Sequence, residues 1–294
     1  ERKNVAATVQ RAIELAGVEM ARALHESTGY KAFSLAGGVA FNIDLNGAIL
    51  RQPFVNDLFI QPAAGDAGTA LGAALYAYVE EVGSRPSFKM SHAYWGPSFS
   101  EEAIERELRR MRLKYEEVSD VAGAVADLVA SGKVVGWYHG RMEWGPRALG
   151  CRSILADPTV KEMWRRVNDV KEREPWRPLA PTIIEGEAAK FLEGAYPSPF
   201  MLLAFKVKEE KVDDIPAVVH VDGSVRPQTI SREVNPLYFE VIERFSKRKG
   251  VPVILNTSLN LRGKPIARTP RDALMTFLLS GMDCIAMPPF IVYR

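Results

Sequence analysis

The chain has 294 residues, more than one hydrophobic core usually organises, so two domains are expected. The formal net charge is only +2, and the basic residues gather in motifs instead of tails, which argues against bulk electrostatic binding of nucleic acid. No apolar run approaches the length of a bilayer crossing, and two cysteines are too few for a disulfide scaffold, so the sequence predicts a cytoplasmic protein without a membrane segment.

The first ninety residues are predicted to begin with an amphipathic helix. Apolar residues recur at spacings of three and four over residues 4–28, and Gly29 is expected to end this helix. An apolar strand then leads into a Gly37-Gly38 turn, and Asn42 is a candidate cap for the next helix. Because glycine admits close backbone approach and a helix N-terminus favours negative charge, Gly37, Gly38 and Asn42 are candidate nucleotide contacts.

A second glycine-rich turn follows a strand predicted over residues 54–60. Here Asp66 stands at the entrance to a small-residue helix predicted over residues 67–82. An ordinary helix N-cap is the simpler interpretation of this aspartate, and a ligand contact is the other. Residues 83–98 are rich in Pro, Gly and Ser, which places a domain boundary near residue 90.

The remainder of the chain alternates predicted helices and strands and is therefore expected to be an α/β domain. The predicted helices cover residues 100–112, 121–131 and 270–280. Ser100 is the expected N-cap of the first of these. A buried strand is predicted over residues 133–138, and Cys284 is expected to be a core thiol in a short terminal strand.

Three arginines, a carboxylate and three glycines crowd into residues 139–153, directly after that strand. A guanidinium can grip phosphate or carboxylate through two parallel hydrogen bonds, so this loop is a candidate anion site. Its candidate contacts are Arg141, Glu143, Arg147, Arg152 and Ser153. The alternative is a surface ion-pair network of the arginines with Glu143 and Asp157. Neighbouring arginines could also lower the pKa of Cys151, although packing is the simpler role for that thiol.

Three later segments add polar groups. A proline-stiffened loop over residues 168–181 carries Asn168, Lys171, Arg173 and Arg177. An extended run over residues 219–230 carries Arg226 and Gln228 at alternate positions, so both should face one side. A strand over residues 253–255 is expected to deliver a polar loop that carries Asn256, Thr257, Ser258 and Asn260, whose amides and hydroxyls suit a small planar ligand.

These four segments, in this order, resemble motifs of the O-carbamoyltransferases of the nodulation, tobramycin and cephamycin type. The motifs are Gly-Arg-Met-Glu-Trp-Gly-Pro-Arg-Ala-Leu-Gly at 140–150, Asn…Lys-x-Arg-Glu-x-x-Arg-Pro from 168, Asp-Gly-Ser-x-Arg-x-Gln-Thr from 222 and Asn-Thr-Ser-x-Asn from 256. The resemblance covers essentially the whole chain. Two residues depart from the family pattern: His139 stands where Gln is expected, and Cys151 where Asn is expected.

The resemblance implies a partial actin/sugar-kinase-like (RNase H-like) domain over residues 1–90 and a threonylcarbamoyl-adenylate-synthase-like α/β domain over residues 91–294. In the family's first domain, an aspartate matching Asp66 joins two histidines of a His-x-x-x-His motif in binding a catalytic metal. No histidine pair of this chain has that spacing. The resemblance therefore implies an N-terminally truncated chain, with a transition metal, Fe²⁺, at Asp66 only in the complete protein.

The resemblance also implies that the second domain converts carbamoyl phosphate and ATP, with Mg²⁺, to a carbamoyl-adenylate, whose carbamoyl group passes to a hydroxyl of a small molecule. Lys171, Arg177 and Arg226 would act on the carbamoyl phosphate or the adenylate phosphate. Arg147 and Arg152 would hold nucleotide phosphates. The other contacts implied in this domain are Arg141, Glu143, Ser153, Asn168, Gln228, Asn256, Ser258 and Asn260.

Two other functions remain open at this point. One is an enzyme of tRNA threonylcarbamoylation, which shares both domain types and would need a basic RNA surface. The other is a non-catalytic nucleotide-binding module. Neither a membrane nor nucleic acid is an expected partner, and a homodimer is left open.

Overall fold

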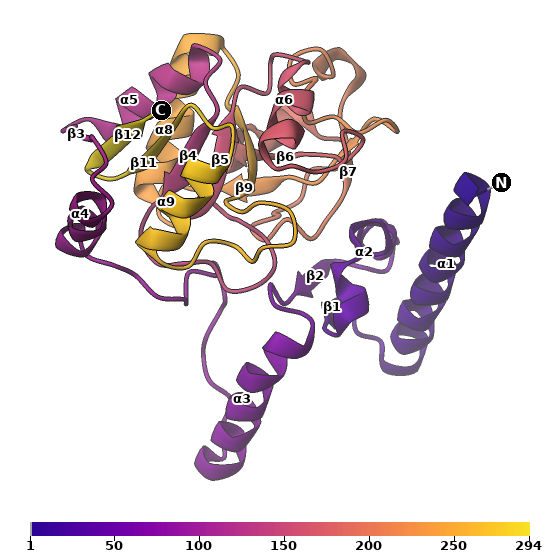
Figure 1. Ribbon diagram of the computed structural model, residues 1–294. Helices are drawn as coiled ribbons and strands as arrows, with labels where there is room; N and C mark the ends of the chain where they lie inside the picture. Colours follow the sequence, from indigo (N-terminus) through magenta and orange to yellow (C-terminus); the bar gives the residue numbers. More distant parts are fainter. Residues whose placement is uncertain (1) are drawn as a thin grey trace. The chain divides into compact units, whose positions relative to one another are not determined.

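A computed structural model describes residues 2–294 and separates them into two compact units (Figure 1). Unit 1 contains the described residues up to Met90 together with Leu202–Ala204. Unit 2 contains Ser91–Met201 and Phe205–Arg294. The chain therefore enters unit 1 a second time for three residues. Among the described residues, no helix combines the length and the apolarity that crossing a membrane requires.

Unit 1 is built on a β-α-β crossover. Strands β1 (Ala32–Leu35) and β2 (Asp57–Ile60) pair in parallel, which requires a connection that crosses back over the sheet. The connection consists of the 3-10 helix η1 (Gly38–Phe41) and helix α2 (Ile43–Leu50). The strand predicted over residues 54–60 is confirmed only in its second half, because a turn occupies its beginning.

Helix α1 (Arg2–Thr28) confirms the helix predicted over residues 4–28 and packs on α2. It ends at Gly29, whose φ of 73° lies in the left-handed region and whose N–H donates to the His25 carbonyl at 2.7 Å. The approach of the two helices is close at Gly17, where a side chain would overlap Leu45. After β2, the 3-10 turn η2 (Asp66–Gly68) leads into helix α3 (Thr69–Val82).

Unit 2 is centred on an eight-stranded mixed sheet, which confirms the predicted α/β class. Strand β4 is parallel to β11 and β6 is parallel to β9, while the other neighbours are antiparallel. In spatial order the strands are β3 (Glu116–Glu117), β12 (Phe290–Tyr293), β11 (Cys284–Met287), β4 (Val135–Tyr138), β5 (Arg152–Ala156), β10 (Val253–Ser258), β6 (Ala180–Ile184) and β9 (Gln228–Ile230). A separate antiparallel pair is formed by β7 (Phe205–Lys206) and β8 (Ser224–Val225).

Helices α5 (Val121–Ala130) and α8 (Pro236–Lys249) form the main core with this sheet. Val135 and Trp137 alternate along β4 and point into that core, where both side chains are fully buried. Burial of one large apolar side chain contributes about 1.5–3 kcal/mol. Helix α9 (Pro270–Leu279) packs on β4 and β11 without joining that core, so helices lie on both faces of the sheet (Figure 1).

The remaining described helices of unit 2 are α4 (Glu101–Arg110), α6 (Met163–Val170), α7 (Ala188–Phe191) and the 3-10 turns η3 (Glu185–Glu187) and η4 (Glu209–Lys211). The helices predicted over residues 100–112, 121–131 and 270–280 are confirmed as α4, α5 and α9. Their starts follow local capping signals. The Ser100 hydroxyl accepts from the Ala103 N–H at 3.3 Å, and Thr269 forms a capping box with Asp272.

The prediction that the strand beginning at Val253 ends at Leu255 is wrong. Strand β10 continues through Ser258, because Asn256, Thr257 and Ser258 pair with β5. Asn256 consequently lies inside the sheet instead of in a polar loop. The run from Arg226 to Gln228 is also not one strand, because Arg226 follows β8 and Gln228 begins β9, which belongs to a different sheet.

Candidate anion-binding site

The four motif segments meet at one end of the large sheet. Strands β4 and β10 end there, whereas β5, β6 and β9 begin there, as the pairs Tyr138–Arg152, Ser258–Ser153 and Thr182–Gln228 show. The loops after β4 and β10 and the segments before β6 and β9 therefore lie at the same end of the strands, which we call this edge of the sheet. The strand pairing therefore brings the four segments together in space.

Three guanidinium groups, which we call the arginine cluster, gather at this edge: Arg147, Arg173 and Arg226. Their charges act on one another. Burial and the charges of Arg147 and Arg173 lower the pKa of Arg226 to about 9. Burial and the charge of Arg177 lower the pKa of Arg173 to about 10, and burial lowers the pKa of Arg147. All three groups still carry their positive charge at neutral pH.

The arginine cluster lacks a counter-ion. The Nε atoms of Arg147 and Arg226 are buried without a hydrogen-bond partner. The nearby carboxylate of Glu174 pairs with Arg177 and Arg262, and no ion pair within residues 2–294 involves the cluster itself. Because buried donors and mutually repelling charges are costly when uncompensated, the arrangement fits an anion that accepts from several guanidiniums at once.

Lys171 follows α6 and ties that helix to the loop after β10. Its Nζ donates to the Ser258 carbonyl, to the Ser258 hydroxyl at 3.3 Å, and to the carbonyl and side-chain oxygens of Asn260, each at 2.9 Å. These acceptors are all neutral. Burial and the charge of Arg173 lower the pKa of Lys171 to about 7, so the side-chain amine is only partly protonated near neutral pH.

Asn168 holds the loop between Lys171 and β6 in place. Its side-chain oxygen accepts from Nε of Arg173 at 2.5 Å, and its amide nitrogen donates to the Arg177 carbonyl at 3.0 Å. The Arg177 side chain itself lies at the rim, 51% exposed and 3.0 Å from Glu174. Arg173, to which the motif assigns no role, thus stands between Lys171 and Arg226. In the sequence, the only indication of this role is that Arg173 follows Lys171 by two residues.

A buried polar network lies beneath this edge. The Asn256 amide donates to the Thr182 hydroxyl at 3.0 Å and to the Gln228 side-chain oxygen at 3.2 Å. The hydroxyl of Tyr238 donates to Thr182 at 2.9 Å, and Gln228 donates to the Leu149 carbonyl at 2.8 Å. The Asn256 amide nitrogen and the Gln228 side chain therefore join β10, β6 and β9, while the Asn256 side-chain oxygen is buried without a hydrogen-bond partner in the described part of the chain. Thr182 and Tyr238 lie outside the four motifs, so the sequence did not indicate that they belong to this network.

Glu143 organises the backbone that follows Arg147. Its Oε1 accepts from the N–H groups of Leu149, Cys151 and Arg152 at 2.7, 2.7 and 3.1 Å. Ser153 adds a further bond, since its hydroxyl accepts from the Gly150 N–H at 3.1 Å. Both side chains are buried. Their bonds shape the loop that presents Arg147.

The other two arginines of this loop are bonded to backbone carbonyls. Arg152 is fully buried, stacks 3.7 Å from the centroid of the Tyr138 ring, and donates to the His139 and Cys151 carbonyls, each at 2.9 Å. Arg141 is exposed and donates to the Gly96 and Trp95 carbonyls at 3.0 and 2.9 Å. Nε of Arg147 and Nε of Arg152 are both buried without a hydrogen-bond partner among the described residues, but of the three motif arginines only Arg147 belongs to the arginine cluster.

The alternative of an ion-pair network is wrong. Glu143 bonds to backbone N–H groups, and Asp157 pairs with Lys249 at 2.9 Å. The alternative of a lowered thiol pKa is also wrong, because burial raises the pKa of Cys151 well above its ordinary value, and the buried thiol fits the simpler packing role. Cys284 is a fully buried core thiol, as predicted.

Both histidines near the motifs are neutral at physiological pH. Burial and the charge of Arg152 lower the pKa of His139 to about 4. Burial and the charge of Arg226 lower the pKa of His220. The influence of Arg226 on His220 places that ring beside the arginine cluster.

The candidate residues of unit 1 lie on a separate set of turns. Gly37 adopts a φ of 97° and donates its N–H to the Ala64 carbonyl at 2.7 Å, and Gly38 begins η1. Asn42 caps α2 by accepting from the Leu45 N–H at 3.0 Å and also donates to Gln10. Asp66 begins η2, but the residue before α3 is Gly68, so the N-cap interpretation of Asp66 is wrong. Within residues 2–294, no three His, Cys, Asp or Glu side chains stand where they could share a metal ion.

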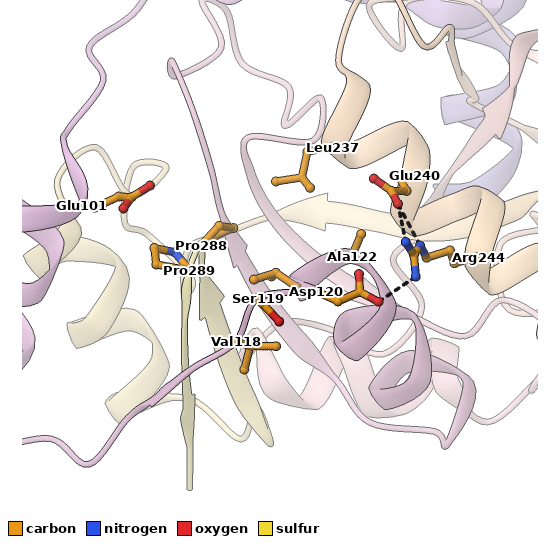
Figure 2. A pocket seen from close by; sticks show the side chains of 11 residues that line it. Glu101, Val118, Ser119, Asp120, Ala122, Leu237, Glu240, Arg244, Pro288 and Pro289 are labelled. Atoms are coloured by element: carbon orange, nitrogen blue, oxygen red, sulfur yellow. Dashed lines mark hydrogen bonds and ion pairs between the residues drawn. The ribbon is translucent and has the colours of Figure 1, made fainter.

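A hollow of about 520 Å³ lies at the start of α5 (Figure 2). Leu237, Pro288 and Pro289 contribute apolar walls. Figure 2 shows Arg244 between Glu240 and Asp120, with contacts of 2.6 and 2.7 Å. The charge of Arg244 is already balanced by these two carboxylates, so the described residues that line the hollow include no unpaired cation that would bind an anion, in contrast to the arginine cluster.

Comparison with known proteins defines the family. A model of the carbamoyltransferase N-terminus matches residues 1–75, and a model of the carbamoyltransferase C-terminus matches residues 126–294. The nodulation protein NolO of Bradyrhizobium diazoefficiens is 43% identical over 100% of this chain and 55% of its own length. An uncharacterised protein of Methanocaldococcus jannaschii is 36% identical over 99% of this chain and 49% of its own length. The chain belongs to the carbamoyltransferase family.

The chain spans about half the length of the curated relatives it matches, 55% for NolO and 44% for the nodulation protein NolNO of Sinorhizobium fredii. Among solved structures, Sua5 of P. abyssi in complex with L-threonine matches 53% of this chain and 45% of its own, at 17% identity and a TM-score of 0.38. A score this low carries no argument about the chain.

Proposed function

We propose that unit 2 performs the first half-reaction of an ATP-dependent carbamoyl transfer, in which carbamoyl phosphate and ATP give a carbamoyl-adenylate. The step consumes one water and releases orthophosphate and pyrophosphate, and the carbamate oxygen becomes bonded to the α-phosphorus of ATP. The observation that carries the proposal is the arginine cluster, whose buried Nε donors of Arg147 and Arg226 have no partner in the protein. Membership in the carbamoyltransferase family supports the carbamoyl group as the one transferred.

The electrostatics of this edge suit such substrates. Carbamoyl phosphate and ATP bring several negative charges together, and the reaction requires that these charges be neutralised while the attacking and leaving oxygens are held in line. Fixed guanidinium forks supply both charge and direction without reorganising during the reaction. Magnesium, when it is bound with ATP, would neutralise further phosphate charge.

Each residue receives a role in this proposal from its position. Arg147, Arg173 and Arg226 contact anionic oxygens of the substrates, and Arg177 acts at the rim. Lys171 holds Ser258 and Asn260 at this edge through its hydrogen bonds. Its positive charge beside Arg173 depends on pH, because its pKa is about 7. Glu143, Arg152 and the network around Asn256 position the loops, because their hydrogen bonds join backbone and side-chain groups of different strands and loops.

Transfer of the carbamoyl group to a hydroxyl of a small molecule is proposed for the whole protein, with a metal near Asp66. The described residues do not fit that metal by themselves, since Asp66 has no second and third ligand beside it. No step of the half-reaction proposed for unit 2 uses this metal.

Exchange of labelled pyrophosphate into ATP tests the half-reaction. We expect exchange that depends on carbamoyl phosphate and is strongly reduced by Arg226→Ala. The control is Arg110→Ala, which changes an arginine on α4 whose side chain is 64% exposed. If the wild-type chain shows no carbamoyl-phosphate-dependent exchange at any substrate concentration, the proposal is wrong.

A further inference from the structure

Trp176 is the most exposed tryptophan of the described residues. Its exposed fraction is 70%, against 43% for Trp95, while Trp137 is fully buried. An indole is large and mostly apolar, so leaving it in water forgoes a substantial free energy of burial. Such a side chain next to a charged site is explained when a ligand covers it.

The backbone on both sides of Trp176 is fixed. The Asn168 amide donates to the Pro175 carbonyl at 3.4 Å and to the Arg177 carbonyl at 3.0 Å. The indole of Trp164 donates to the same Arg177 carbonyl at 2.9 Å, and the Arg177 N–H donates to Glu174 at 3.2 Å. These bonds fix the backbone that carries the indole. A ligand that stacks on the ring therefore has to order only the side chain and not the loop.

Trp176 belongs to the loop that carries the cationic groups. The Arg177 guanidinium lies 5.8 Å from the centroid of its ring. Arg177 in turn lowers the pKa of Arg173, and Arg173 lowers that of Arg226, so the charges form a continuous series from the ring to the arginine cluster. A ligand that spans this series needs a planar apolar group at one end and phosphate groups at the other.

We propose that Trp176 is the stacking platform for the base of the nucleotide whose phosphates the arginine cluster binds. The inference rests on the proposed function, because it assumes that a nucleotide is the occupant. Carbamoyl phosphate has no aromatic surface, so the platform serves ATP alone. Stacking tolerates any base but distinguishes a nucleotide from its bare phosphate chain.

Calorimetric affinities for ATP and for inorganic tripolyphosphate separate the base from the phosphates. We expect Trp176→Ala to weaken ATP binding by about 5- to 150-fold, the effect of removing one stacked base, and to change tripolyphosphate binding by less than about twofold. Trp176→Phe should keep most of the ATP affinity because phenylalanine retains a stacking face. Tyr293→Ala, at a 44% exposed aromatic residue of β12, is the matched control and should bind both ligands as the wild type does.

Each other outcome overturns the inference. If Trp176→Ala leaves the ATP affinity unchanged, the ring does not stack on the base, and an accompanying change in oligomeric state would assign it to contact between copies of the chain. If Trp176→Ala weakens both ligands equally, its role is to support the loop. If the wild-type chain binds neither ATP nor tripolyphosphate, the proposed function fails, and the stacking inference fails with it.

Discussion

The three arginines of residues 139–153 are chemically identical and yet have three different environments. The Arg152 guanidinium donates to backbone carbonyls in the interior, Arg141 donates to carbonyls at the surface, and Arg147 belongs to the arginine cluster. The sequence predicts that this loop is basic. It cannot show which guanidinium meets a carbonyl, because those carbonyls belong to backbone whose path is set by distant pairing.

Arg226 should contribute directly to anion binding. We expect Arg226→Ala to weaken carbamoyl phosphate binding by about 1.5–3 kcal/mol, the usual contribution of charged hydrogen bonds. The unliganded protein should not lose stability, because the substitution removes a charge that Arg147 and Arg173 repel. Titration calorimetry and thermal melting check the two expectations, with Arg110→Ala as the control. An unchanged affinity would remove Arg226 from the site.

Lys171 should make anion binding dependent on protons. Its folded pKa is about 7, below its ordinary value, because of burial and the charge of Arg173. An anion on the arginine cluster offsets that charge and raises the pKa again, so at pH 8 a largely neutral Lys171 gains a proton when phosphate binds. Calorimetry at pH 8 in buffers of different ionisation enthalpy should therefore detect proton uptake. Lys171→Met should abolish most of this uptake, and persistence of the full uptake in that variant would assign it to another group.

At the scale of the elements, local signals were sufficient for most helices. Ser100 and Thr269 cap α4 and α9 with side chains that lie within a few residues of the bonds they form. Strand β10 was predicted too short, because its last three residues are held by pairing with β5, far away in the sequence. The polar residues predicted to begin a ligand loop therefore lie in a sheet, and only contacts between distant strands reveal this.

Arg152 joins β5 to the preceding loop, and the same loop offers a matched control in Arg141. We expect Arg152→Ala to lower the free energy of unfolding by at least about 2 kcal/mol, because it leaves buried carbonyls of His139 and Cys151 without a donor. Arg141→Ala, at an exposed side chain, should change it by less than about 0.5 kcal/mol. Denaturant unfolding of the two variants measures the difference. Equal effects would mean that Arg152 does not organise this loop.

At the scale of the whole chain, composition and length predict two domains, and the motifs predict the family that the comparisons establish. The second passage of the chain through unit 1 at Leu202–Ala204 was not predicted. No periodicity or motif marks these residues. Their place is fixed by Asn46, whose amide donates to the Leu202 carbonyl at 2.8 Å across a long separation in sequence.

Asn46 therefore offers a test of whether the anion site depends on unit 1. Its fully buried amide also donates to the Ala40 carbonyl at 2.8 Å, so Asn46→Ala leaves two carbonyls without a donor and should destabilise unit 1 by about 1–3 kcal/mol. Hydrogen exchange should then accelerate in α1 and α2. The affinity for phosphate should change by less than about twofold, because Lys171 and the arginine cluster all belong to unit 2. A tenfold loss of affinity would show that unit 1 helps to build the site, and the half-reaction would then have to be assigned to both units together.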